Sequence, residues 1–185
     1  GDSPYQSFST FAGNPYYIDL QEFIDNGWLT KEECHEAYEE YYESNEWYKR
    51  ASEDEKNNYI DYEAHYYARF SLLRRAYERS YIDSDEGYAK FILEESYWLN
   101  DYALYMAIKD DKRGASIYDW EPELRLRKKS AIEKAKKELA PHIGFYKFLQ
   151  YFFKKQWLSL KKYANEKGID IIGDIPIYVA SDSAD

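Results

Sequence analysis

The sequence predicts an α/β fold of which this chain contains a mostly helical part. Most of the chain has apolar residues at the three- and four-residue spacing of amphipathic helices. Near its end, Ile169 to Val179 is a nearly continuous β-branched run that follows a long amphipathic segment, as expected of a helix leading into a parallel strand covered on both faces. Such a pair is one unit of an α/β barrel or an open α/β sheet, so a larger protein is expected.

The first segment is expected to be an ordered loop. Residues 1–15 contain Pro, Gly and Asn where periodic apolar residues would stand in a helix, and they also carry aromatic rings. A short helix is expected over residues 20–26, with Asp19 as its cap and Gly27 as its end.

Two further helices are expected before residue 80. Thr30 and Glu33 form a capping-box pattern that starts a helix extending to about Arg50. The next helix starts near Tyr62, and its predicted apolar face consists of residues at helical spacing: Tyr66, Phe70, Leu73 and Tyr77.

Further segments are predicted in the second half of the chain. Ser84 is expected to cap a helical run that continues to about Lys109, residues 114–122 are expected to form a loop, and residues 123–140 a basic helix. After Pro141 comes a long helix that ends at Gly168. Its wide apolar face consists of Phe145, Phe148, Leu149, Phe152, Phe153 and Trp157.

Composition argues against several function classes. The net charge of −10, from 35 acidic and 25 basic residues, disfavours nucleic acid as a partner, because proteins that bind its backbone carry excess basic charge. No apolar run approaches the ~20 residues that cross a bilayer, so no membrane partner is expected. The single cysteine, Cys34, favours a reducing, cytoplasmic location. It shares no metal-ligand spacing with His35, His65 or His142, and neither a metal nor a cofactor is expected.

Two acidic residues near the end of the chain are candidate site residues. Asp174 lies inside the apolar run, and Asp182 lies just beyond it, at the end of a predicted strand where barrels place their functional groups. One or both carboxylates can accept hydrogen bonds in a polyol pocket. Alternatively, Asp174 binds neighbouring backbone and Asp182 caps the next helix. The residues alone leave both alternatives open.

Three segments together resemble one known family across the whole chain and in that family's order. They are residues 1–15 (GDSPYQSFSTFAGNP), 97–106 (YWLNDYALYM) and 168–185 (GIDIIGDIPIYVASDSAD). They resemble 4-α-glucanotransferase, the amylomaltase or disproportionating enzyme of maltodextrin and starch metabolism. Residues 35–59 depart from the family's pattern and support no functional inference.

The resemblance implies a (β/α)8 TIM barrel with a mostly helical inserted subdomain. In that arrangement residues 1–18 would form a substrate-site loop, residues 19–140 a helical insertion, and residues 141–185 a barrel helix, its strand and the following loop. The resemblance also implies a retaining mechanism, in which a carboxylate nucleophile forms a glycosyl-enzyme and a second carboxyl group acts as acid and base. Both groups are expected downstream of Asp185, so no catalytic residue is expected in this chain.

The implied donors and acceptors are α-1,4-glucans: maltooligosaccharides, starch or glycogen. Carried over by position, Tyr5 would be the aromatic platform beneath the sugar, Ser3 its neighbour in the loop, and Asp182 an acidic residue lining the same subsite. Asp174 is the remaining candidate for substrate binding. The alternative is a non-catalytic helical module that binds glucans or a protein partner, which would lack the downstream carboxylates.

Overall fold

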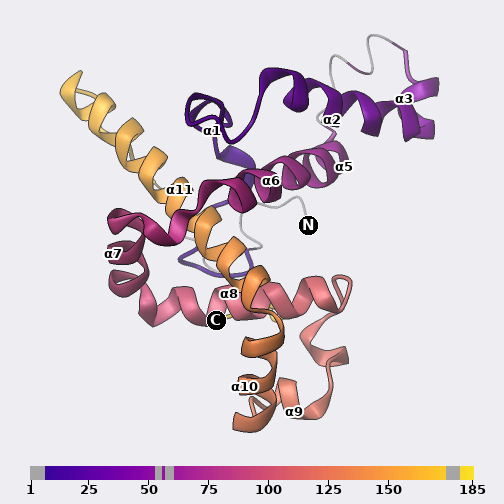
Figure 1. Cartoon of the computed structure of the whole chain (residues 1–185), viewed down its shortest axis with the longest axis vertical. Coiled ribbons are helices and arrows are strands. Elements are labelled where there is room, and N and C mark those ends of the chain that lie inside the picture. The colour runs from indigo at the N-terminus through magenta and orange to yellow at the C-terminus, as the bar shows by residue number, and fades with distance from the viewer. Residues whose placement is uncertain (1–6, 53–55, 57–60, 174–179) are drawn as a thin grey trace. The chain divides into compact units, whose positions relative to one another are not determined.

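The chain is helical throughout most of its length. The computed structural model describes residues 7–52, 56, 61–173 and 180–185. Two compact units are formed, unit 1 from residues 1–15 and 83–185 and unit 2 from residues 16–82. Figure 1 shows the helices of both units along the chain. No helix among the described residues is both long and apolar enough to cross a membrane.

Unit 2 is built from helices around buried side chains that include Phe23, Leu72 and Leu73. Its elements are α1 (Gln21–Asp25), α2 (Lys31–Ser44), α3 (Glu46–Arg50), α5 (Tyr62–Ala64), the π-helical turn η2 (His65–Arg69) and α6 (Phe70–Ser80), and the 3-10 turn η1 (Pro15–Tyr17) precedes them. The predicted short helix is confirmed as α1, but its N-cap position is Leu20 and not the predicted Asp19, whose carboxylate accepts from the Gln21 N–H at 2.9 Å one residue earlier. It ends at Gly27, whose φ of 73° is the left-handed conformation that glycine adopts without strain.

The predicted capping box is confirmed at the start of α2. The Thr30 hydroxyl accepts from the Glu33 N–H at 3.1 Å, and the Glu33 carboxylate accepts from the Thr30 N–H at 3.0 Å. The predicted end at Arg50 needs correction, because the helix breaks at Asn45. That residue is extended, and its side chain accepts from the Tyr48 N–H at 3.0 Å to cap α3.

The predicted apolar face of the next helix is confirmed as buried at Leu73, is half-buried at Phe70 and Tyr77, and is wrong at Tyr66, which is 47% exposed. Only Leu73 of that set is buried, and the buried stripe instead consists of Ala64, Ala68, Leu72, Leu73 and Ala76. The π-helical turn η2 changes the phase of the helix, since a π turn holds more residues than an α turn. The aromatic rings lie partly exposed and contact one another. The ring centres of Tyr66 and Phe70, for example, are 5.4 Å apart.

Unit 1 centres on two long helices. Its elements are α7 (Glu86–Glu94), α8 (Ser96–Asp111), the 3-10 turn η4 (Ile117–Asp119), α9 (Pro122–Arg125), α10 (Lys129–Glu138) and α11 (Ala140–Glu166), preceded by the 3-10 turn η3 (Ile82–Ser84). Helices α8 and α11 pack against each other (Figure 1). Burial extends around α8 because it contacts α7, α10 and α11, and this surrounds it with apolar surface.

Several predicted boundaries in unit 1 shift by a few residues. Asp85 caps α7 by accepting from the Tyr88 N–H at 2.7 Å, so the assignment of this cap to Ser84 is corrected. The run predicted to continue to Lys109 is divided at Glu95 into α7 and α8. The predicted basic helix is likewise divided into α9 and α10, with Arg127 left-handed (φ 53°) in the turn between them.

The predicted apolar face of α11 is confirmed over its first half. Phe145, Phe148, Leu149 and Phe152 are buried, whereas Trp157 is 40% exposed. Pro141 lies in the first turn of this helix, where its missing N–H is not needed. Gly168 ends the helix with φ 75°, and the Ile169 N–H donates to the Ala164 carbonyl at 3.0 Å. Residues 169–173 lie in neither helix nor strand, and 174–179 lie outside the described residues, so the strand remains a prediction.

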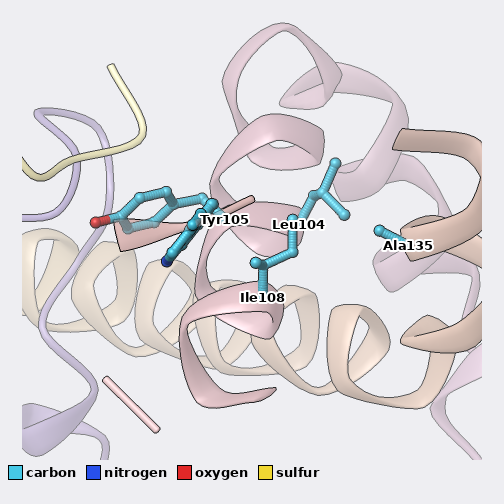
Figure 2. Packing of buried hydrophobic residues seen from close by; sticks show 5 residues of the cluster. Leu104, Tyr105, Ile108 and Ala135 are labelled. Atoms are coloured by element: carbon cyan, nitrogen blue, oxygen red, sulfur yellow. The ribbon is translucent and has the colours of Figure 1, made fainter. Parts of the chain in front are cut away.

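One core cluster of unit 1 includes Tyr105, whose hydroxyl lies at the candidate site. Leu104, Tyr105 and Ile108 of α8 pack with Trp120 and with Ala135 of α10. Figure 2 shows the Tyr105 ring at the edge of this cluster, with its hydroxyl directed away from Leu104 and Ala135. The ring therefore contributes apolar burial, while the hydroxyl remains available to a partner outside the core.

Candidate functional site

Asp182 is the predicted substrate-binding residue that the structure describes. Ser3, Tyr5 and Asp174 lie outside the described residues. The site is therefore built from the segments that adjoin them along the chain, which we call the N-loop (residues 7–13) and the C-segment (residues 180–185). Both belong to unit 1.

The N-loop and the C-segment are hydrogen-bonded to each other, although Thr10 and Asp185 are 175 residues apart in the sequence. The Ala184 N–H donates to the Phe8 carbonyl at 2.8 Å. The Asp185 carboxylate accepts from the Ser9 hydroxyl at 3.1 Å, from the Thr10 N–H at 2.6 Å and from the Thr10 hydroxyl at 2.8 Å. Two of the segments that carry the family resemblance therefore meet in one place.

Helix α11 holds the other end of the N-loop. Gln150, which is 2% exposed, accepts from the Gly13 N–H at 2.8 Å and donates to the Gly13 carbonyl at 2.9 Å. A Cβ at Gly13 would lie 2.0 Å from the Phe153 ring. Glycine is thus required here by the close approach of backbone and ring.

Asp182 lies at a junction of three donors. Its Oδ1 accepts from the Tyr105 hydroxyl at 2.8 Å and from the Ile117 N–H at 2.9 Å. Its Oδ2 accepts from Lys109 Nζ at 2.6 Å. The Lys109 side chain is 9% exposed and that of Asp182 is 28% exposed, so this ion pair is largely removed from water.

Lys109 also contacts the N-loop. Its Nζ donates to the Ala115 carbonyl at 3.3 Å and lies 5.2 Å from the centre of the Phe8 ring. The Phe8 ring in turn lies 6.2 Å from the Tyr105 ring. One ammonium group of α8 therefore binds the C-segment through Asp182 and contacts the N-loop through an aromatic face.

The electrostatics keep Asp182 ionised. Burial opposes the charged form, but hydrogen bonds from Lys109, the Ile117 N–H and Tyr105 outweigh it, so the pKa of Asp182 lies below its ordinary value of 3.8. Burial and the bond to this carboxylate raise the pKa of Tyr105, which remains a neutral donor. The result is a fixed anionic acceptor at neutral pH.

The junction also bears on the two alternatives for Asp182. A carboxylate has about four acceptor sites, and donors from the described residues occupy three of them, so a further donor such as a sugar hydroxyl has one to bind. The Asp182 carboxylate also accepts from the backbone N–H of Ile117, the first residue of the 3-10 turn η4, and this bond has a structural role. One carboxylate can perform both tasks.

Aromatic rings of α8 also contact the N-loop. Phe11 of the N-loop is 54% exposed, and its ring centre lies 5.5 Å from that of Tyr97 and 6.0 Å from that of Trp98. Apolar ring faces next to hydrogen-bonding groups are suited to the two sides of a sugar ring. Among the residues that the structure describes, no group of three or more His, Cys, Asp or Glu side chains forms a metal site.

Sequence reasoning missed the partners that hold the site together. Tyr105 lies within residues 97–106, one of the three segments that carry the family resemblance, but no local pattern pairs it with Asp182. Lys109 follows an apolar run on α8. It stands four residues after Tyr105, and this spacing indicates that both side chains lie on one face of the helix. Gln150 is a single polar residue in the apolar face of α11, which indicates a buried residue with a specific partner.

The comparisons with known proteins cover this whole region. The family model described as 4-alpha-glucanotransferase (glycoside hydrolase 77) matches residues 1–185. This chain belongs to that family. The 4-alpha-glucanotransferase of Clostridium butyricum is 43% identical over 185 residues, which are 100% of this chain and 35% of that protein. The 4-alpha-glucanotransferase of Thermus thermophilus is 38% identical over 189 residues, covering 100% of this chain and 34% of that protein.

A solved structure agrees with this family assignment. The amylomaltase from Streptococcus agalactiae in complex with acarbose matches with a TM-score of 0.80 and 33% identity, over 99% of this chain and 34% of that chain. The chain thus spans about a third of the length of the 4-alpha-glucanotransferase relatives it matches. The N-loop and the C-segment are both included in the matched family region.

Proposed function

We propose that the protein containing this chain is a 4-α-glucanotransferase that transfers α-1,4-glucan segments between maltodextrins. The observation that carries the proposal is the family match over residues 1–185. The joining of the N-loop to the C-segment supports it, since these segments carry two of the three motifs of the resemblance. Donors and acceptors would be maltooligosaccharides, starch or glycogen.

The proposed mechanism places the chemistry outside this chain. A nucleophilic carboxylate and an acid/base carboxyl group, supplied by the rest of a (β/α)8 barrel, would form and resolve a glycosyl-enzyme, with a glucan hydroxyl replacing water. Residues 1–18 and 141–185 would contribute a loop, a helix and a strand to the barrel, and residues 19–140 its helical insertion. The single Cys34 favours a cytoplasmic location.

The proposed role of this chain is to bind the sugar. Tyr5 would present an aromatic face, with Ser3 beside it, and Asp182 would accept from a sugar hydroxyl through its unoccupied acceptor site, with Asp174 as a further candidate. The solved amylomaltase was determined with acarbose, which supports a glucan-like ligand for the family.

The test uses the full-length protein and maltotriose, with product lengths resolved over time. We expect longer maltodextrins and glucose to appear together. Tyr5→Ala is expected to lower kcat/KM for transfer about fivefold, as loss of about 1 kcal/mol of ring contact requires, whereas Tyr5→Phe retains most of the rate.

Tyr17→Ala is the matched control, because Tyr17 is a 78% exposed ring outside the N-loop. It should leave the rate nearly unchanged. Glucan binding without any transfer by the wild-type protein would instead support a non-catalytic module.

A further inference from the structure

Asp185 is the side chain that most directly fastens the N-loop to the C-segment. Three donors of the N-loop converge on its carboxylate: the Ser9 hydroxyl and both the N–H and the hydroxyl of Thr10. Ser9 is 1% exposed, and its oxygen also accepts from the Phe11 N–H at 3.2 Å. The carboxylate therefore organises the local turn of the N-loop as well as its attachment.

We propose that Asp185 is a positioning residue for sugar binding and transfer, which fixes the N-loop relative to the C-segment. The proposal rests on the proposed function. Tyr5 precedes Phe8 by three residues, and Asp182 precedes Asp185 by three. Three residues span at most about 11 Å of chain, so the bonded pair lies close in sequence to both sugar-binding candidates.

The two segments are anchored separately, and Asp185 couples them. The C-segment is held on α8 by the ion pair of Asp182 with Lys109, and the far end of the N-loop is held on α11 by Gln150. Between these anchors, the described contacts that remain without Asp185 are the hydrogen bond from the Ala184 N–H to the Phe8 carbonyl and the packing of the Phe8 ring near Lys109 and Tyr105, and none of them engages the side chain of Ser9 or Thr10. The bonds to the Asp185 carboxylate add three directional constraints on Ser9 and Thr10, and bonds to a charged acceptor are stronger than neutral ones.

Loss of Asp185 should loosen the loops more than the fold. Its N-loop partners Ser9 and Thr10 lie outside the helices, whose cores do not depend on this carboxylate. A misplacement of about 1 Å at a reacting centre lowers rates greatly, because transfer requires the sugar to be held in one geometry. The expected consequence is a kinetic defect with little change in global stability.

The experiment compares four variants of the full-length protein with wild type in maltotriose disproportionation: Asp185→Ala, Asp185→Asn, Thr10→Val and the double variant Thr10→Val/Asp185→Ala. We expect Asp185→Ala to lower kcat/KM for transfer about tenfold and to raise the share of hydrolysis. Asp185→Asn should recover part of the rate, because its amide oxygen can still accept from the Thr10 N–H. The double variant should be no slower than Asp185→Ala, since both changes remove the same contact.

Asp83→Asn is the matched control, because Asp83 is an exposed aspartate of unit 1. It should match wild type in rate and in Tm. Unchanged kinetics in Asp185→Ala, losses that add in the double variant, or a Tm that falls in proportion to the rate would each overturn the positioning role.

Hydrogen exchange separates this proposal from the proposed function. Faster exchange of the N-loop amides in Asp185→Ala, with no change in Asp83→Asn, supports the coupling even if the wild-type protein shows no transfer. Identical exchange in wild type and Asp185→Ala refutes the coupling, whatever the enzyme activity.

Discussion

Replacing Asp182 by asparagine should destabilise the protein strongly, because it leaves the Lys109 ammonium buried without an anionic partner. The bond that is lost is 2.6 Å long, and the Lys109 side chain is only 9% exposed. Breaking a buried ion pair at one partner costs about 3–5 kcal/mol. Here Asp182 is 28% exposed, and Lys109 keeps the Ala115 carbonyl and the Phe8 ring, so we expect about 2–3 kcal/mol.

Two further variants complete a thermodynamic cycle. Lys109→Met should cost less, about 1–2 kcal/mol, because the Asp182 carboxylate keeps two donors and partial exposure. The double variant Asp182→Asn/Lys109→Met leaves no uncompensated charge, so its cost should fall short of the sum of the single costs by about 2 kcal/mol. Unfolding of the full-length protein in urea measures each difference.

The exposed ion pair between Lys112 and Glu121 provides the control. Its 2.8 Å contact is short, but the side chains are 29% and 57% exposed, so water replaces the partner when one is removed. Lys112→Met and Glu121→Gln should therefore show almost no coupling. If the Asp182 and Lys109 variants couple as weakly as this pair, the argument from burial is wrong.

The pH dependence gives an independent check on Asp182. Because the pKa of Asp182 is lower in the folded protein than its ordinary value of 3.8, its contribution is fully present above pH 3.8. That contribution is lost as the pH falls through the lowered folded-state pKa. The stability difference between wild type and Asp182→Asn should therefore be constant near neutrality and shrink below about pH 3.8. A difference that persists undiminished at lower pH would show that the charge of Asp182 is not its source.

Three other predictions concern the loops, the caps and the isolated chain. Thr30→Ala should lower the free energy of unfolding by about 1 kcal/mol through loss of its capping bond, whereas Ser96→Ala, at a helix start without a side-chain cap, should have little effect in the same urea titration. Gly13→Ala should cost about 1–3 kcal/mol by forcing the Phe153 ring to move, and Phe153→Leu should recover part of this loss; no recovery would place the strain elsewhere. The 185-residue chain alone should release no glucose from maltotriose, because the proposed nucleophile and acid/base are outside it, and measurable release by the purified chain would contradict this.

Local features of the fold were predictable because their causes lie within a few residues. The capping box of Thr30 and Glu33 depends on side chains three positions apart, and the ends at Gly27 and Gly168 depend on one residue that adopts positive φ without strain. The buried aromatic face of α11 follows from its spacing in the same way. These signals survive in the structure because packing reinforces them.

Features set by distant contacts were not predictable from local patterns. The π turn η2 interrupts the regular α-helical spacing where Ala68 is buried and Tyr66 is exposed, and residue spacing alone does not reveal such a turn. The burial of Lys109 depends on Asp182, which lies 73 residues further along the chain. A lysine near the end of a helix is normally solvated, so its burial required knowledge of that partner.

The geometry also changes how the two aspartates of the C-segment are understood. An acceptor held by three donors does not reorganise when a sugar hydroxyl arrives, so the bonds that make Asp182 structural would also make it an effective binding group. Asp185, whose carboxylate accepts from Ser9 and Thr10 of the N-loop, sets the relation between two loops and not the position of a helix. Loss of activity in an Asp182 variant therefore cannot by itself identify a sugar contact, because the same substitution releases Lys109. The Asp185 variants can distinguish loop position from fold stability. The hydrogen bonds that they remove join Asp185 to Ser9 and Thr10 of the N-loop, and these bonds are separate from the packing of α8 against α11.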